Sequence, residues 1–141
     1  MSASAVIRPG TGRDFAAIGA LLWPDSPVDG EAEAGFHFDP GGLFVAEQGG
    51  ELVGMGCVRL RFPRRSAFAL VEEIYVHPGH RGSGLGTRLL GALEGAARGR
   101  GFRLIAAVCT PQGLGFFRRS GFEVLGEEYP LDWGRYVIKR L

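Results

Sequence analysis

The chain has 141 residues, the size of one ordinary domain, so we expect a single domain over residues 1–141. A formal net charge of +1 with 45% hydrophobic residues indicates a globular protein with a core, and argues against nucleic acid or an anionic membrane as a partner. The N-terminus lacks a signal-peptide pattern and no apolar run approaches about 18 residues, so we expect a cytoplasmic protein with no membrane partner.

The first predicted elements are a strand and a helix. Residues 5–8 form a short apolar run that a Pro-Gly pair ends, which indicates a strand. Thr11, followed by Asp14 three residues later, resembles a capping box, and apolar residues then recur at helical spacing, so an amphipathic helix is predicted over residues 12–22. Residues 24–42 are polar and glycine-rich, and we expect a loop there that can contain one short helix.

Three strands are predicted next. Residues 43–48 and 52–62 form a pair joined by two glycines, which favour a hairpin turn. Residues 67–76 form a long strand that is apolar on both faces except for Glu72 and Glu73. Such a strand belongs in the middle of a sheet that is covered on both sides.

The last part of the chain predicts two helices and three strands. Apolar residues recur at a spacing near four from Leu85 to about Gly99, which indicates a helix, and residues 104–108 form a second buried strand. A short helix then begins at Pro111 and ends before Gly121. With strands at 122–125 and 135–138, the order predicts an α/β fold: a mixed sheet of about six to seven strands with helices on both faces.

A glycine-rich turn joins the long strand to the helix that follows it. Glycines let successive backbone N–H groups point into one concavity, and the helix N-terminus adds a favourable dipole, so this turn is suited to bind phosphate. Arg81 and Arg88 can add charge-assisted hydrogen bonds. The residues of the turn are Arg81-Gly82-Ser83-Gly84-Leu85-Gly86.

Two better-known phosphate motifs do not fit this turn. A Walker A loop requires a lysine after its second glycine, and the turn has none. The dinucleotide fingerprint Gly-x-Gly-x-x-Gly fails in both glycine frames, because Thr87 or Leu89 stands where the third glycine belongs. A tight turn without any ligand, and an enzyme that binds another nucleotide, are the alternatives.

The turn and a second segment together resemble the GNAT superfamily of acyl-CoA N-acyltransferases. Arg81-x-x-Gly84-x-Gly86 matches the superfamily signature Gln/Arg-x-x-Gly-x-Gly/Ala, and Ile74-Tyr75-Val76-His77-Pro78 matches its usual lead-in. The residues from Phe116 to Phe122 are similar to its Phe-Tyr-x-x-x-Gly-Phe segment. The resemblance implies a mostly antiparallel sheet with a V-shaped splay between the fourth and fifth strands, and acetyl-CoA as the cosubstrate.

The resemblance also implies where the cofactor binds. The main chain of the long strand would hold the cofactor amides, and the N–H groups of the turn would hold the pyrophosphate. The expected cofactor-binding residues are Ile74, Tyr75, Val76, Arg81, Gly82, Ser83, Gly84, Leu85, Gly86, Thr87 and Phe117.

The catalytic base is expected to be Glu73 or Glu72. An alkyl amine is mostly protonated at neutral pH, so a base must remove a proton before the amine attacks. The two glutamates are consecutive on a strand, so we expect their side chains to point to opposite faces. A charge partner for the substrate, or an ion pair with an arginine, remains an alternative role for either one.

The usual proton donor of the family is missing. Where the family carries a tyrosine this chain has Phe117, which cannot donate a proton. Tyr129 and Tyr136 are candidate replacements, and a thiol with a pKa of about 8.5 can also leave as the thiolate. Cys57 and Cys109 lie too far apart in the sequence to form a metal-ligand pair, so we expect no metal.

The sequence therefore predicts an N-acetyltransferase that moves the acetyl group of acetyl-CoA to a primary amine of a small molecule or peptide, by direct attack in a ternary complex. The alternative is a non-catalytic acyl-CoA-binding sensor or regulator with the same fold. The small size and the final strands are compatible with a homodimer. The acceptor is expected to depend on residues 24–42 and 127–133.

Overall fold

The computed structural model describes residues 4–60, 68–125 and 134–141. Short 3-10 turns at Gly12–Asp14, Pro40–Gly42, Pro78–His80 and Pro111–Gly113 precede α1, β2, the glycine-rich turn and α4. The strands are β1 (Val6–Pro9), β2 (Leu43–Gln48), β3 (Glu51–Arg59), β4 (Ala69–Val76), β5 (Leu104–Cys109), β6 (Glu123–Leu125) and β7 (Arg135–Arg140). The helices are α1 (Phe15–Leu22), α2 (Pro27–His37), α3 (Leu85–Gly99) and α4 (Leu114–Arg119).

The strands form one seven-stranded sheet in the order β1-β2-β3-β4-β5-β7-β6. All neighbours are antiparallel except β4 and β5, which are parallel. This confirms the mixed, mostly antiparallel sheet, and it confirms that the strand apolar on both faces lies at the centre.

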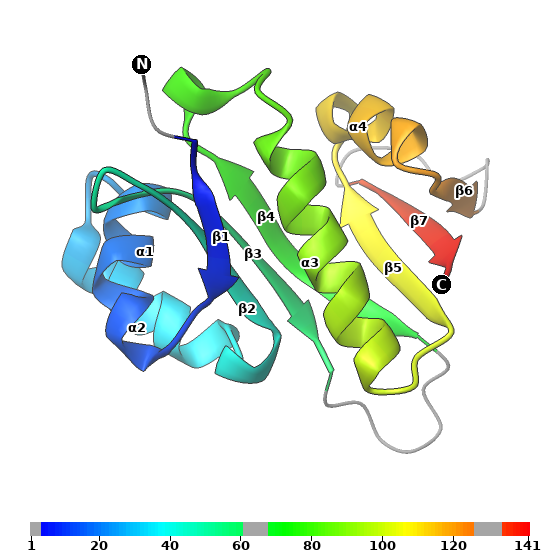
Figure 1. Ribbon diagram of the computed structural model, residues 1–141, viewed down its shortest axis with the longest axis horizontal. Coiled ribbons are helices and arrows are strands. Elements are labelled where there is room, and N and C mark those ends of the chain that lie inside the picture. Colours follow the sequence, from blue (N-terminus) through cyan, green and yellow to red (C-terminus); the bar gives the residue numbers. More distant parts are fainter. Residues whose placement is uncertain (1–3, 61–67, 126–133) are drawn as a thin grey trace.

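Helices cover both faces of the sheet, as predicted (Figure 1). Leu90 and Leu93 of α3 and Phe117 of α4 belong to the core on one face. Ile18 of α1 and Ala34 of α2 pack with buried residues of β2 and β3 on the other face. No helix among the described residues is long and apolar enough to cross a membrane.

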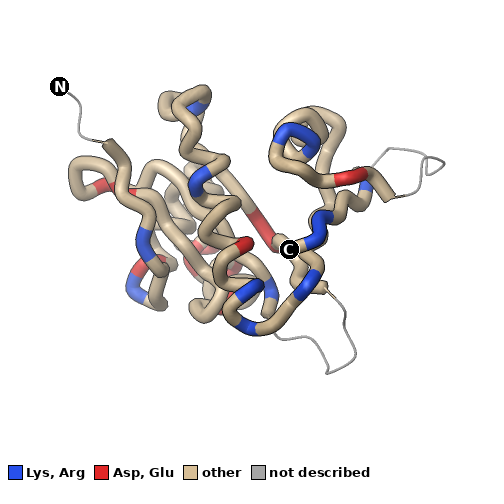
Figure 2. Tube along the Cα trace, turned by 45° about the vertical axis from the view of Figure 1, so that its right-hand side comes forward, with Lys and Arg blue, Asp and Glu red and all other residues tan. Residues whose placement is uncertain are grey.

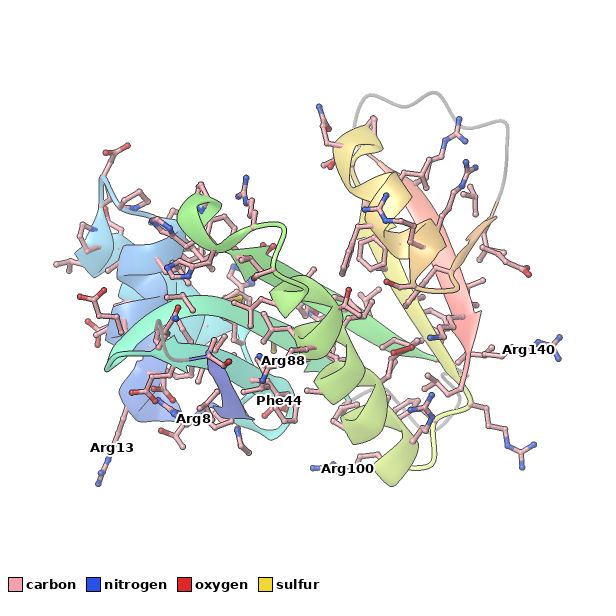
Figure 3. The ribbon with its side chains drawn as sticks, turned by 45° about the horizontal axis from the view of Figure 1, so that its top comes forward. Arg8, Arg13, Phe44, Arg88, Arg100 and Arg140 are labelled. Atoms are coloured by element: carbon pink, nitrogen blue, oxygen red, sulfur yellow. The ribbon has the colours of Figure 1, made fainter. Side chains whose placement is uncertain are left out.

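The capping box at the start of the first helical segment is confirmed. The Thr11 side chain accepts a hydrogen bond from the backbone of this turn, and the Thr11 N–H donates to Asp14 Oδ2 at 2.8 Å. Arg8 donates to both oxygens of Asp14, at 2.8 and 3.0 Å, and its Nε donates to Glu47 at 3.0 Å. Arg8 thus joins β1 to the helical segment and β2, whereas Arg13 points away from the protein (Figure 3). The hydrogen bond from Arg8 lowers the pKa of Asp14.

The prediction for residues 24–42 was incomplete, because α2 occupies eleven of them. The polar composition gave no bounds for this helix, which is held mainly by close contact with α1. A Cβ atom at Gly19 would lie 2.3 Å from the Glu31 backbone nitrogen, and one at Gly30 would lie 2.7 Å from the Gly19 carbonyl oxygen. The two helix backbones therefore touch, and neither position has room for a side chain.

This contact predicts opposite effects for two glycine-to-alanine substitutions. Gly19→Ala should lower the free energy of unfolding by about 1–3 kcal/mol, because the methyl group forces α1 away from α2. Gly91→Ala should raise it by about 1 kcal/mol, because a Cβ there meets nothing within 4 Å and alanine is the better helix former. Urea unfolding of both variants measures the difference. A Gly19→Ala variant with an unchanged free energy of unfolding would contradict the close helix contact.

Candidate active site

The central strands β4 and β5 separate part of the way along their length. They pair only from Ala69↔Ile105 to Val71↔Ala107, although β4 continues to Val76. On the other edge of β4, the His77 N–H donates to the Val53 carbonyl oxygen at 2.8 Å. Antiparallel pairing alternates along a strand, so the main-chain groups of Ile74 and Val76 point toward β5. The splay leaves them without a strand partner there, as the resemblance to the superfamily implied.

Both catalytic candidates lie where this separation begins. In the β3–β4 register, Cys57 pairs with Glu73 and Val58 with Val71, so Glu72 is an extra residue in a β-bulge. Glu73 lies on the same face as its register partner Cys57. Glu72 forms an ion pair with Arg59, which shares that face because it stands two residues beyond Cys57 in β3.

The expectation that the two glutamates point to opposite faces is therefore wrong. It assumed regular alternation along the strand, and the bulge removes that alternation at Glu72. Both carboxylates lie on the α1–α2 side of the sheet. The ion pair of Glu72 corresponds to the alternative role considered for either glutamate, which leaves Glu73 as the carboxylate whose charge is not balanced by Arg59.

The environment of Glu73 makes its carboxyl group a weaker acid than that of a free glutamate. Although the residue reaches solvent, the protein around its carboxyl group is dense, and desolvation raises the pKa of Glu73 above the usual range of a glutamate. The Ile74 N–H donates to Glu73 Oε1 at 3.2 Å and opposes this shift, while the nearby Glu72 adds to it. A carboxylate with a raised pKa is a better base. Burial raises the pKa of the neighbouring Cys57 thiol to about 12, so that thiol stays protonated.

A cavity of about 510 Å³ occupies the open part of the splay. Arg81 on the turn before α3 and Arg119 on α4 both line it. Figure 2 shows basic residues on these two segments. Nine of the predicted cofactor-binding residues line it: Ile74, Tyr75, Val76, Arg81, Gly82, Gly84, Leu85, Gly86 and Thr87.

The glycine-rich turn has a backbone shape that favours glycine. Gly82 and Gly84 have φ values of +81° and +80°, in the left-handed region that glycine favours, and Gly84 is the N-cap of α3. Arg81 donates from Nε to the Val76 carbonyl oxygen at 2.9 Å, and its guanidinium lies 5.5 Å from the centre of the Tyr75 ring. Arg81 therefore fixes the turn to the end of β4 while it still borders the cavity.

Two of the predicted cofactor-binding residues, Ser83 and Phe117, do not line this cavity. Ser83 donates to the His80 carbonyl oxygen at 2.7 Å and, like Arg88, lines a separate cavity of about 310 Å³. Phe117 is only 5% exposed and packs against Phe122, with their ring centres 5.1 Å apart. Phe117 thus belongs to the core and does not border the 510 Å³ cavity. Tyr129, the first candidate proton donor, lies outside the described residues.

Sequence reasoning missed Gln112 and Arg119 in the wall that faces the turn. Gln112, Phe116 and Arg119 line the cavity from the α4 side, and so does His80 from the turn. The first three stand at positions i, i+4 and i+7, which share one face of a helix. This spacing is the signal that could have identified them. Within residues 4–60, 68–125 and 134–141, no group of three His, Cys, Asp or Glu side chains is placed to hold a metal ion.

Comparison with known proteins shows the family of the chain. Residues 14–122 match the profile of the acetyltransferase (GNAT) family. The chain is 36% identical over 138 residues to an aminoglycoside N(6')-acetyltransferase type 1 of Stenotrophomonas maltophilia, with 87% of this chain and 90% of that protein covered. It is 38% identical over 85 residues to glucosamine 6-phosphate N-acetyltransferase 1 of Oryza sativa subsp. japonica, with 57% of this chain covered. The match spans 52% of that rice protein, about half its length.

Solved structures confirm the predicted fold. A phosphinothricin acetyltransferase from Sinorhizobium meliloti, solved in complex with AcCoA, superimposes with a TM-score of 0.77 at 24% identity, covering 99% of this chain and 89% of that one. The N-acetylglutamate synthase of Neisseria gonorrhoeae, complexed with coenzyme A and N-acetyl-glutamate, gives a TM-score of 0.77 at 22% identity. That match covers 100% of this chain and 36% of the synthase.

The raised pKa of Glu73 predicts how its removal affects stability. Above the pH at which Glu73 ionises in the folded protein, its charge is desolvated only in the folded state, so Glu73→Gln should raise the free energy of unfolding at pH 8. The gain should vanish near pH 4. There Glu73 is protonated in the folded protein, and the same glutamate in the unfolded chain, with a pKa of about 4.3, is mostly protonated as well.

Glu72→Gln is the matched control. It removes the partner of Arg59 and should lower stability at pH 8. Urea unfolding at the two pH values measures both variants. If Glu73→Gln loses as much stability at pH 8 as Glu72→Gln, Glu73 has a structural role and the assignment is wrong.

Proposed function

Because this chain belongs to the acetyltransferase (GNAT) family, we propose that it transfers the acetyl group of acetyl-CoA to a primary amine of a small molecule or peptide. The observation that carries the proposal is the cavity in the splay, which joins the unpaired strand edge to the glycine-rich turn. Several relatives are named acetyltransferases of amino compounds, among them the aminoglycoside and glucosamine 6-phosphate enzymes.

The cavity suits the chemistry of acetyl-CoA. The pyrophosphate would lie on the N–H groups at the start of α3, where the helix dipole favours negative charge. The amide-containing arm of the cofactor would pair with the main chain of Ile74 and Val76, as a peptide adds to a free strand edge. Phe116 supplies an apolar wall, and Arg119 supplies positive charge opposite the turn.

The reaction needs a neutral amine and a place for negative charge. The amine nitrogen attacks the thioester carbon, and the carbonyl oxygen becomes an oxyanion in the tetrahedral intermediate. The Ile74 N–H points into the splay and would donate to this oxygen in place of its present acceptor, Glu73. Collapse of the intermediate forms the amide bond, breaks the carbon–sulfur bond and releases CoA.

We assign the base to Glu73. Its carboxylate takes the proton that the attacking amine must lose, and exchange of the Ile74 N–H to the thioester oxygen would raise the pKa of Glu73 further. Phe117 has no proton to donate and is buried away from the cavity. Tyr136, the candidate donor within the described residues, does not line the cavity either. The CoA sulfur therefore leaves as a thiolate, which takes a proton from solvent or from the conjugate acid of the base.

Release of free CoA in the presence of amines tests the transfer. We expect one N-acetylated product per CoA released with at least one member of a panel of an aminoglycoside, a hexosamine phosphate, an alkyl amine, an amino acid and a peptide. Glu73→Gln should lower kcat by about a hundredfold or more, whereas Glu31→Gln, the same change at an exposed position on α2, should not. Tight acetyl-CoA binding without turnover of any amine would support the sensor alternative instead.

The placement of the pyrophosphate gives a separate prediction. Gly84→Glu puts a carboxylate at the turn and should abolish detectable acetyl-CoA binding by calorimetry. Gly101→Glu is the matched control, because Gly101 has a similar φ of +85°, also has nothing within 4 Å of its Cβ position, and lies outside the cavity. Both variants should lose the same stability, about 1–2 kcal/mol. Equal acetyl-CoA affinity in the two variants would refute the placement.

A further inference from the structure

Three apolar side chains form a continuous strip across β5, β7 and β6. Val108 is in register with Tyr136, and Tyr136 with Leu125. Side chains that are paired across neighbouring strands lie on the same face of a sheet. Their exposed fractions are 50%, 56% and 49%, so the strip is open to solvent along its whole length.

The apolar strip lies on the α1–α2 side of the sheet. Ala107 and Val137, which stand next to Val108 and Tyr136 along their strands, belong to the core beneath α3 and α4. Strand alternation turns Val108 and Tyr136 to the opposite face. The core around α1 and α2 takes its strand residues from β2 and β3, with Tyr75 of β4 at its margin. Among the described residues, neither helix packs on the strip.

Glu73 stands across the splay from this strip. The last paired positions of β4 and β5 are Val71 and Ala107. Glu73 lies two residues beyond Val71, Val108 lies one residue beyond Ala107, and both side chains are on the same face. One side of the opening thus carries a carboxylate and the other an apolar surface, while Glu72 is already paired with Arg59.

We infer that the acetyl acceptor is a primary amine with an apolar body, such as an arylalkyl or alkyl amine. This inference rests on the proposed acetyl transfer. The ammonium group of the acceptor lies at Glu73, which has the complementary charge, and its apolar group covers Val108 and Tyr136. Because the strip is continuous with the opening of the splay, an acceptor held there has its nitrogen at the position from which it must attack.

A hydroxylated sugar amine would pair with the Glu73 carboxylate but would not match the apolar surface of the strip. Its polar groups would lose water against Val108 and Tyr136 without gaining hydrogen bonds from them. An aryl group would gain from burial of the same surface, enough for a preference of about tenfold or more. The proposed acceptor class thus differs from the amino sugars in the names of two relatives.

The test compares kcat/KM for 2-phenylethylamine, ethanolamine and an aminoglycoside with the full chain. We expect a preference of at least about tenfold for 2-phenylethylamine over each of the others. Tyr136→Ser and Val108→Ser should each reduce that preference several-fold, through a higher KM for 2-phenylethylamine. Tyr136→Phe keeps the apolar ring and should keep the preference. Val6→Ser, at an equally exposed apolar position on β1, should change nothing.

Three results would overturn the inference. The first is an aminoglycoside or ethanolamine that reacts as well as 2-phenylethylamine. The second is a loss of kcat with every amine in Tyr136→Phe, because the protein would then use the hydroxyl and not the ring. The third is a dimer, measured by light scattering, that Tyr136→Ser dissociates, because the strip would then bind a second copy of the chain. Absence of CoA release with all amines would instead refute the proposed transfer itself.

Discussion

The end of strand pairing between β4 and β5 determines most of what this protein can bind. Beyond Val71↔Ala107 the two strands separate, and the bulge at Glu72 lies at that point. A buried main chain without partners is costly, so an unpaired strand edge in the centre of a sheet calls for a ligand with its own donors and acceptors. In the described structure, the Ile74 N–H on this edge donates a hydrogen bond to the Glu73 side chain. The Val76 carbonyl oxygen accepts one from the Arg81 side chain.

The same separation divides the sheet into two parts that meet at the closed end of the splay. One part carries β1 to β4 with α3, and the other carries β5 to β7 with α4 (Figure 1). Three residue pairs between β4 and β5 join them, and Glu94 of α3, which is 7% exposed, forms an ion pair with Lys139 of β7. Because both walls of the cavity are attached at this end, the turn before α3 and the face of α4 can stay at a fixed separation.

The sequence predicted those features that depend on local pattern. The bounds of β2 and the capping box at Thr11 both follow from residue types and their spacing. It failed where the cause lies in another segment. The helix α2 depends on contact with Gly19, and the shared face of Glu72 and Glu73 depends on the β3–β4 register. The choice of Phe116 over Phe117 as the cavity wall depends on the rotation of α4 against the sheet.

Residue-resolved hydrogen exchange with and without acetyl-CoA tests the central claim most directly, because it observes the main chain of the splay itself. The account predicts that saturating acetyl-CoA slows exchange of the Ile74 and Val76 amides and of the amides at the start of α3. Amides of the β1–β2 pair, on the far side of the sheet, should exchange as before. Unchanged exchange at Ile74 and Val76 with the cofactor bound would contradict the account, since the cofactor would then bind without using the unpaired strand edge.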